Sequence, residues 1–322
     1  MATFSTTSAV CPLHIDFHKS LKCPKLTTSS SYRSAKLTIR VLGIYNGRKD
    51  ILHAFCYNEL DASKGPAEII SCLHRLIYEF DDLDSCRWLK IWSDNAHSEI
   101  KNCLFCWYLD FLQQQKSVQR IDLNFLTSEH GFSICDRMFG VMERHIQKYT
   151  ENLAKPEDWF EALKNSSEKI NVIRMTREHF LDFETYFKNK YTKRFLSVTK
   201  EKFYYHDLAW MNFGIGERIK DGKMGIYSHP NVAWFRTENS VESPPIEVDF
   251  RKEKQRRNLQ DCVLDIKYKT IRKPKNPRAV THDLVKLAAN TMSEANHRYY
   301  ERMRLTYLEV FGDDGSEDEE QT

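Results

Sequence analysis

The sequence predicts an α/β protein built on a mixed β-sheet with helices packed against it. Three strand-like segments come first, and a helix, a strand, a helix, a strand and a helix follow them, an order typical of this class. Hydrophobic residues make up 41% and aromatic residues 12% of the 322 residues, which is enough for a core and too much for a disordered chain. We therefore expect one main α/β unit with an appendage.

Five segments are predicted to be strands because they are short and rich in β-branched and aromatic residues. Asn46-Gly47 separates the second segment from the third, and this dipeptide between two such runs is a strong hairpin signal. The fifth segment alternates polar and apolar residues with a period of two. The strands are expected at residues 14–17, 36–45, 51–57, 88–92 and 120–126.

Three helices are predicted. Two of them lie between consecutive strands, and the third follows the last strand. Pro66 lies in the first turn of the first helix, and the apolar residues from Ile69 to Ile77 repeat with the 3.6-residue period of one helical face. The helices are expected at residues 66–77, 99–112 and 134–149.

The pattern becomes less regular after Lys155. We expect a helix at 156–163, a strand at 171–175, a helix at 178–190, a small β appendage at 204–235 and a helical region at 281–307. The predicted organisation is a flexible N-terminus (1–11), a core (12–165), a C-terminal β and helical extension (166–310) and a disordered acidic tail (311–322).

The charges are unevenly distributed along the chain. The formal net charge is +3, from 48 Lys and Arg against 45 Asp and Glu, but the last ten residues hold six of these acids and no base. Residues 251–278 hold eleven Lys or Arg and three acids, a local excess that attracts polyanions. Nucleic acid is therefore a candidate partner, and the alternative is a solvated basic loop. The predicted contacts are Lys101, Arg251, Lys252, Arg256, Arg257, Lys267, Lys269, Arg272, Lys273 and Lys275.

The cysteines and the hydropathy indicate the compartment. Nine cysteines with irregular spacing, in a chain large enough to fold without disulfides, predict reduced thiols and a nuclear or cytoplasmic protein. Cys103 and Cys106 form an isolated CxxC in a helical segment, which indicates buried small side chains in place of a zinc site. No apolar run approaches the ~20 residues of a membrane helix, so no membrane partner is expected.

Three acidic residues occupy special positions in the predicted order. Asp16 lies in the first strand, Asp94 directly follows the fourth, and Asp136 begins the helix after the fifth. The first and fourth strands of a mixed sheet can be neighbours, which would bring these carboxylates together. Glu143 follows Asp136 by about two helical turns, and His130 precedes it and could orient a water or a phosphate.

Carboxylate oxygens suit Mg²⁺ or Mn²⁺, and two such ions can activate water for phosphodiester chemistry. The acids therefore predict a catalytic site in which Asp16, Asp94 and Asp136 are the metal ligands. Glu143 or His130 is expected to assist catalysis at this site. The alternative is that Asp94 is a turn residue and that Asp136 only caps its helix.

Several short motifs resemble one family. They are His14-Ile-Asp-Phe17, Gly65-Pro-Ala-Glu-Ile-Ile-Ser-Cys-Leu73, Trp92-Ser-Asp-Asn95, Glu129-His130, Cys135-Asp-Arg-Met-Phe-Gly140 and Pro156-Glu-Asp-Trp159. From about Pro12 to Tyr307 the chain is similar to the uncharacterised ribonuclease-H-like domains of animal genomes that are thought to derive from transposases. The resemblance implies a five-stranded sheet in the order 3-2-1-4-5, acids at Asp16, Asp94 and Asp136, and DNA in preference to RNA as the partner.

Two functions follow from these expectations. The first is a transposase-derived, ribonuclease-H-like protein that binds nucleic acid and cleaves or transfers phosphodiester bonds with Mg²⁺ or Mn²⁺. The second is a catalytically inactive, domesticated module that binds nucleic acid or protein. The retained acids favour the first function. Ala96-His-Ser-Glu-Ile100 favours the second, because the family usually has a glycine-containing turn there.

Overall fold

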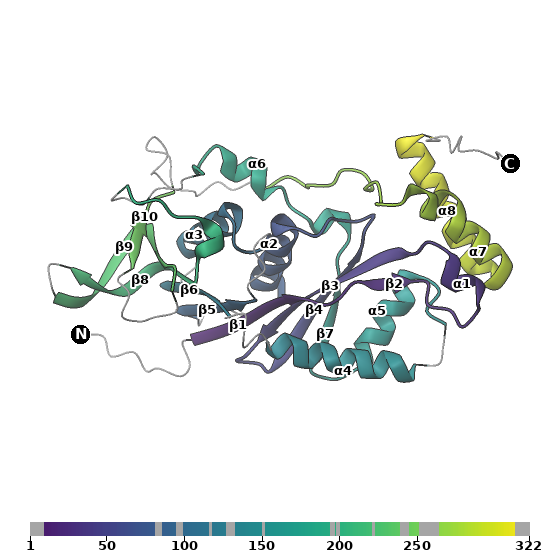
Figure 1. Cartoon of the computed structure of the whole chain (residues 1–322), viewed down its shortest axis with the longest axis horizontal. Coiled ribbons are helices and arrows are strands. Elements are labelled where there is room, and N and C mark those ends of the chain that lie inside the picture. Colours follow the sequence, from purple (N-terminus) through teal and green to yellow (C-terminus); the bar gives the residue numbers. More distant parts are fainter. Residues whose placement is uncertain are drawn as a thin grey trace.

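One mixed sheet runs through the computed structural model of the chain (Figure 1). The structure describes residues 10–80, 86–94, 99–115, 118–126, 133–149, 152–193, 197, 200–220, 223–238, 245–250 and 264–312. The strands are β1 Val10–Phe17, β2 Leu21–Cys23, β3 Leu37–Asn46, β4 Ile51–Asn58, β5 Trp88–Ser93, β6 Arg120–Phe125, β7 Ile170–Arg174, β8 Trp210–Lys220, β9 Lys223–Arg236 and β10 Ile246–Val248. Their order is β10-β9-β8-β6-β5-β1-β3-β4-β7, and β2 pairs with β3.

The five predicted strands form the centre of this sheet in the predicted order. They are β4-β3-β1-β5-β6, with β3 antiparallel to both of its neighbours and β5 parallel to both of its own. The prediction of a sheet limited to five strands is wrong. β7 adds to β4, and the segment expected to be a separate appendage joins the sheet because β8 pairs with β6. A lone hairpin is marginally stable in water, and an unpaired sheet edge leaves backbone groups unsatisfied, so both gain from this pairing.

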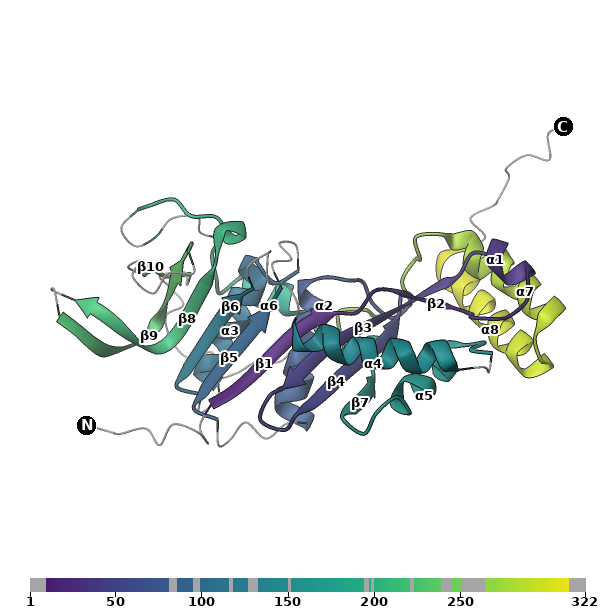
Figure 2. The same cartoon turned by 60° about the horizontal axis from the view of Figure 1, so that its bottom comes forward.

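The helices form a layer on each side of the sheet (Figures 1 and 2). They are α1 Ser30–Arg33, α2 Pro66–Arg75, α3 Cys103–Gln115, α4 Ile134–Lys148, α5 Pro156–Lys164, α6 Phe183–Lys188, α7 Leu284–Thr291 and α8 Glu294–Phe311. One core lies under α2, α3 and α6, where Ile69, Phe105 and Phe183 are fully buried. A second core lies under α4, α5, α7 and α8, where Phe139 and Tyr300 are buried.

The helix boundaries follow capping residues more closely than hydrophobic periodicity. The side chain of Asn102 accepts a hydrogen bond from the backbone N–H of Phe105 at 3.0 Å, so α3 begins at Cys103, later than predicted. Ser293 accepts a bond from the N–H of Asn296 and begins α8. The predicted C-terminal helical region is therefore divided into α7 and α8. The helix predicted at 178–190 is reduced to α6 and a preceding 3₁₀ turn.

The two sides of the sheet are covered unequally. The core under α4 takes its described strand residues from β2, β3, β4 and β7, and none from β5, β6, β8, β9 or β10. Figure 2 shows α4 lying over β1, β3 and β4, with no described helix in front of β5 and β6. Half of this face is therefore open over the described chain.

The described cysteines carry free thiols. Seven of these eight side chains are buried, and only Cys103 is partly exposed. Over the same described ranges, no helix is long and apolar enough to cross a membrane.

Candidate active site

Asp16 and Asp94 lie side by side at the carboxyl ends of two paired strands. β1 and β5 are parallel, and Ile15 is in register with Ser93, so Asp16 lies one residue beyond this pair on β1 and Asp94 directly follows the end of β5. Ile15 is buried in the core under α2 and α3. Because side chains alternate along a strand, the Asp16 carboxylate faces the opposite side, where α4 lies. Asp94 lies beyond the last residue of β5, and Ser93 Oγ donates a hydrogen bond to its Oδ1 at 3.4 Å. The predicted pairing of the first and fourth strands is confirmed.

The first turn of α4 brings Asp136 to the same end of the sheet. The thiol of Cys135 donates a hydrogen bond to the carbonyl oxygen of His14 at 3.3 Å, which holds this turn against β1. Phe139, one turn later, packs on Gly43, and a Cβ atom at Gly43 would lie 2.7 Å from the Phe139 ring. Gly43 is in register with Asp16 on β3, so only a glycine there lets α4 approach so closely.

The three carboxylates act on one another electrostatically. Burial raises the pKa of Asp16 to about 7, and the negative charges of Asp94 and Asp136 add to this increase. Glu99 adds a smaller contribution in the same direction, and a hydrogen bond from the backbone of Phe17 offsets part of it. Close like charges that disfavour ionisation are typical of carboxylates gathered for a functional purpose.

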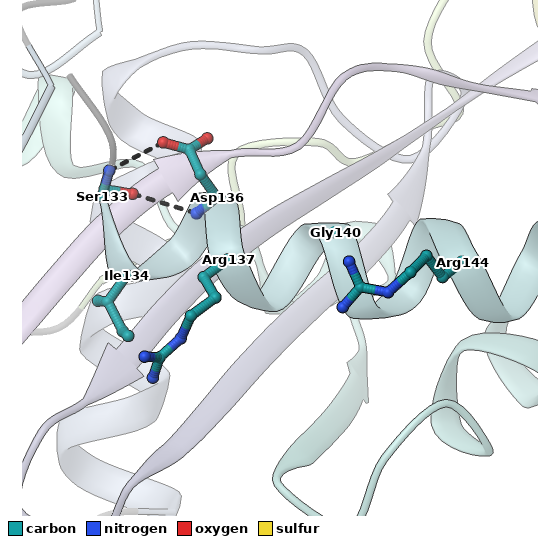
Figure 3. A pocket seen from close by; sticks show the side chains of 6 residues that line it. All are labelled: Ser133, Ile134, Asp136, Arg137, Gly140 and Arg144. Carbon is teal, nitrogen blue, oxygen red and sulfur yellow. Dashed lines mark hydrogen bonds between the residues drawn. The ribbon is translucent and has the colours of Figure 1, made fainter.

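The carboxylates fit a hard divalent cation in their chemistry but not in their spacing. Within the described ranges, no three Asp, Glu, His or Cys residues are placed to hold one metal ion. Asp136 also accepts a hydrogen bond from the backbone N–H of Ser133 at 2.9 Å, while Ser133 Oγ accepts one from the N–H of Asp136 (Figure 3). This capping box confirms that Asp136 caps its helix, as the alternative interpretation expected.

Of the two predicted assisting residues, only Glu143 lies among the described residues. It lies two turns along α4 from Asp136, forms an ion pair with Lys19 at 2.8 Å and lies 3.2 Å from His18 Nε2. The hydrogen bond and the charge of Lys19 lower the pKa of Glu143. The third acid that acts on Asp16, after Asp94 and Asp136, is Glu99, whose carboxylate lies 2.6 Å from Lys64 Nζ. His130 falls outside the described residues.

A groove of about 510 Å³ runs along α4 beside Asp136 (Figure 3). It is lined by Ser133, Ile134, Asp136, Arg137, Gly140 and Arg144. Arg137 and Arg144 are exposed and lie two helical turns apart, about 10 Å along the axis. Guanidinium groups bind phosphate with paired hydrogen bonds, so these residues could hold a polyanion along α4. Arg137 projects from the other side of the helix to the Asp136 carboxylate (Figure 3). Neither arginine was predicted from the sequence, although their seven-residue spacing within one helix was a usable signal.

The comparisons with known proteins give a family without a function. The model of a family described as a domain of unknown function (DUF7869) matches residues 29–208, more than half of the chain. The chain belongs to this family. No curated protein and no solved structure matches it. The part of the chain that DUF7869 matches contains Asp94, Asp136 and the groove along α4, whereas Asp16 lies before it.

The basic segment of this DUF7869 protein is only partly described. Arg251, Lys252, Arg256 and Arg257 lie outside the described residues. Lys267 and Arg272 are used internally, because Lys267 Nζ lies 2.6 Å from the buried Glu68 carboxylate and Arg272 donates to the carbonyl oxygen of Glu59 at 3.1 Å. The other predicted contacts that the structure describes in this segment, Lys269, Lys273 and Lys275, are exposed.

Lys101 is also placed in the interior. Only 7% of its surface is exposed, and its ammonium group donates a hydrogen bond to the carbonyl oxygen of His206 at 3.1 Å. Burial lowers the pKa of Lys101, and its Nζ lies 4.6 Å from the centre of the Phe125 ring. This lysine therefore stabilises the fold and does not lie on a surface that a nucleic acid could contact, contrary to the prediction.

The ion pair of Glu68 and Lys267 is expected to be a strong determinant of stability. Burial alone would raise the pKa of Glu68, but Lys267 and hydrogen bonds from Tyr268 and Ser63 outweigh it and lower this pKa. Lys267→Ala would leave Glu68, which is 1% exposed, as an unpaired buried charge, and we expect a loss of about 3 kcal/mol in the free energy of unfolding in urea. Lys269→Ala, at the exposed neighbouring lysine, should cost less than about 0.5 kcal/mol.

The same pair gives an expected pH dependence. Because the folded-state pKa of Glu68 is lowered, its contribution to stability is complete above the ordinary pKa of about 4 and is lost as the pH falls further. Without Lys267, burial should raise the pKa of Glu68, so the difference in stability between the wild type and Lys267→Ala should shrink progressively as the pH falls through the acidic range. Equal stabilities of the two lysine variants at pH 7 would contradict the prediction.

Proposed function

We propose that this chain is a nucleic-acid-binding protein with a ribonuclease-H-like core of transposase descent, and that it cleaves or transfers phosphodiester bonds with Mg²⁺ or Mn²⁺. The observation that carries the proposal is the meeting of Asp16 and Asp94 at the carboxyl ends of two paired parallel strands, beside Asp136 of α4. The central strand order β4-β3-β1-β5-β6, which is the order that the family resemblance implied, supports it.

In this proposal Asp16, Asp94 and Asp136 would hold the cation, and Asp16 would give up its proton to do so. The cation would supply activation of an attacking water and stabilisation of the charge at phosphorus. Arg137 and Arg144 hold the phosphates of the strand in the groove along α4.

A second candidate function is an inactive binding module. It is favoured by the capping box of Asp136 and by the finding that no three potential ligands among the described residues are placed around one ion. Under this alternative the acids are structural, and Arg137 and Arg144 are the functional groups that remain in the groove.

A nuclease assay separates the two functions. Single- and double-stranded DNA and RNA, labelled at one end, are incubated with the purified protein and Mg²⁺, Mn²⁺ or EDTA. We expect metal-dependent cleavage that Asp94→Asn reduces about 100-fold or more, because a ligand to the ion is lost. Asp265→Asn, the same change at an exposed position, is the matched control. Equal cleavage by wild type and Asp94→Asn would point to a contaminating nuclease and would contradict the proposal.

Metal binding can be measured apart from cleavage. Titration of Mn²⁺, followed by the electron paramagnetic resonance signal of the free ion, should show a site that Asp94→Asn weakens and Asp265→Asn retains. If neither Mn²⁺ binding nor cleavage is found while nucleic acid still binds, the inactive module is the correct function.

A further inference from the structure

Four of the six tryptophans of the chain lie on one half of one sheet face. They are Trp88 and Trp92 of β5, Trp210 of β8 and Trp234 of β9. Their strand neighbours Leu89, Ile91, Met211 and Phe235 are buried in the core under α2 and α3. Since side chains alternate along a strand, the four indoles project from the opposite side, which we name the tryptophan face. The other two tryptophans, Trp107 and Trp159, belong to the two cores.

The tryptophan face belongs to the half of the sheet that no described helix covers (Figure 2). A solvated sheet face normally carries polar residues opposite its buried face. Trp88, Trp92 and Trp210 are nevertheless partly exposed, and Trp234 is 5% exposed. Several large aromatic residues on an open surface mark a binding site more often than a chance arrangement.

Cations accompany the indoles. Lys90 Nζ lies 4.2 Å and the Arg120 guanidinium carbon 4.1 Å from the centre of the Trp88 ring, and the Arg236 guanidinium lies 4.8 Å from that of Trp210. These distances are typical of cation–π contacts. The guanidinium groups are flat, so they extend the planar surface that the indoles offer.

The charge of this face is positive. Among the described side chains of β5, β6, β8 and β9, Asp122 is the one acid on this face, and it is 2% exposed. The Asp122 carboxylate accepts hydrogen bonds from Trp88 Nε1 at 2.5 Å, Arg120 Nε at 2.7 Å and Asn212 Nδ2 at 2.7 Å. Its charge is thus neutralised internally. Glu247 of β10, at the outer edge of the sheet, is the cross-strand partner of Trp234.

We propose that the tryptophan face binds single-stranded nucleic acid. Aromatic and guanidinium planes stack on unpaired bases, and flanking cations contact the phosphates. A duplex keeps its base faces stacked and offers only their edges, so it cannot use such a surface in this way. The inference rests on the proposed function only in taking nucleic acid as the partner, and it adds the strandedness of that partner and its place on the fold.

The face leads directly to the carboxylates. His14 precedes Asp16 by two residues within β1, so both side chains project from one side of that strand, and Trp92 of β5 lies two residues before Asp94. The rings of Trp92 and His14 are stacked, with centroids 6.2 Å apart and planes inclined by 15°. A strand lying across the face would therefore end its path at Asp16 and Asp94.

The test measures binding without cleavage. Fluorescein-labelled oligothymidylate of about 20 nucleotides, and a duplex of equal length, are titrated with the full chain in EDTA, and fluorescence anisotropy gives the dissociation constants. Lys90→Glu and Trp92→Ala are each expected to weaken single-strand binding by about tenfold or more. Lys188→Glu makes the same charge change on α6, on the other side of the sheet, and should change the affinity less than about twofold.

Each other outcome overturns the inference in a distinguishable way. If Lys90→Glu and Trp92→Ala bind like the wild type, nucleic acid binds elsewhere and the proposed function stands. If the wild type binds no oligonucleotide, the inference and the proposed function both fail. Equal affinity for the duplex, with the same loss in the variants, would exclude single-strand recognition. If a variant does not fold, the intrinsic tryptophan fluorescence of the wild type is titrated with the oligonucleotide. An oligonucleotide bound to this face must quench that fluorescence, so binding without quenching would overturn the inference.

Discussion

Replacement of Asp16 by asparagine is expected to raise the free energy of unfolding by about 2 to 4 kcal/mol at pH 8 in metal-free buffer. The pKa of Asp16 is raised to about 7 in the folded protein, by burial first and then by Asp94 and Asp136. At pH 8 the carboxylate must therefore be ionised in an environment that disfavours its charge. Asparagine has nearly the same shape and no charge, so it removes this cost. Urea unfolding at several pH values measures the effect.

The sign of the pH dependence follows from the same shift. Between the ordinary pKa of about 4 and about 7, the unfolded chain has already lost the proton that folded Asp16 keeps, so the contribution of Asp16 to stability falls as the pH rises through this window. The advantage of Asp16→Asn should vanish near pH 4 and be complete above pH 7. Glu161→Gln, at an exposed position of α5, is the control. An advantage of equal size at pH 5 and pH 8 would contradict the explanation.

Replacement of Gly214 by alanine is expected to cost about 4 kcal/mol or more of stability. Gly214 has a φ angle of +83°, in the left-handed region that other residues adopt at a cost, and an added Cβ would lie 2.2 Å from the carbonyl oxygen of Gln119. Gly214 is in register with Arg120, where β8 joins β6 and the register of β8 with β9 shifts. The backbone cannot move away without breaking the junction between the central strands and β8, β9 and β10.

Gly140→Ala is a matched control for this substitution. Gly140 lies within α4, and an added Cβ would meet only the Arg144 side chain, at an ordinary distance of 3.6 Å. Because alanine favours helix over glycine, this variant should be more stable than the wild type by about 0.5 to 1 kcal/mol. Hydrogen exchange of the backbone amides should show the loss in Gly214→Ala first in β8 and β9. Equal stabilities of the two variants would show that the contact with Gln119 has no structural importance.

Local signals in the sequence were sufficient for the centre of the sheet. The Asn46-Gly47 turn determines one hairpin, and β5 and β6 lie in parallel because α3 crosses over between them. These pairings place Asp16 beside Asp94 without any information about distant segments. The first turn of α4 could also be predicted from the sequence. An aspartate at this position suits a capping box and a metal ligand equally, so the residue type alone could not decide between these two roles of Asp136.

The outer strands and the fate of individual cations could not be predicted from local patterns. The hydrophobic periodicity of β8 does not indicate which edge of the sheet this strand joins. That choice depends on which backbone groups remain unpaired after the central strands have formed. A run of basic residues likewise does not show which members form internal contacts. Lys267 is held by Glu68, almost 200 residues earlier in the chain, whereas Lys269 is exposed.

The continuity of the sheet has a consequence for how the chain can be divided. A chain ending at residue 165 would keep β4 and β6 but would lack β7 and β8, which pair with them. Both edges of the remaining sheet would then be open to other chains, and Phe183 would be missing from one core and Tyr300 from the other. We therefore expect that residues 12–165 would not fold as an autonomous unit, because the residues after them complete the sheet on both sides.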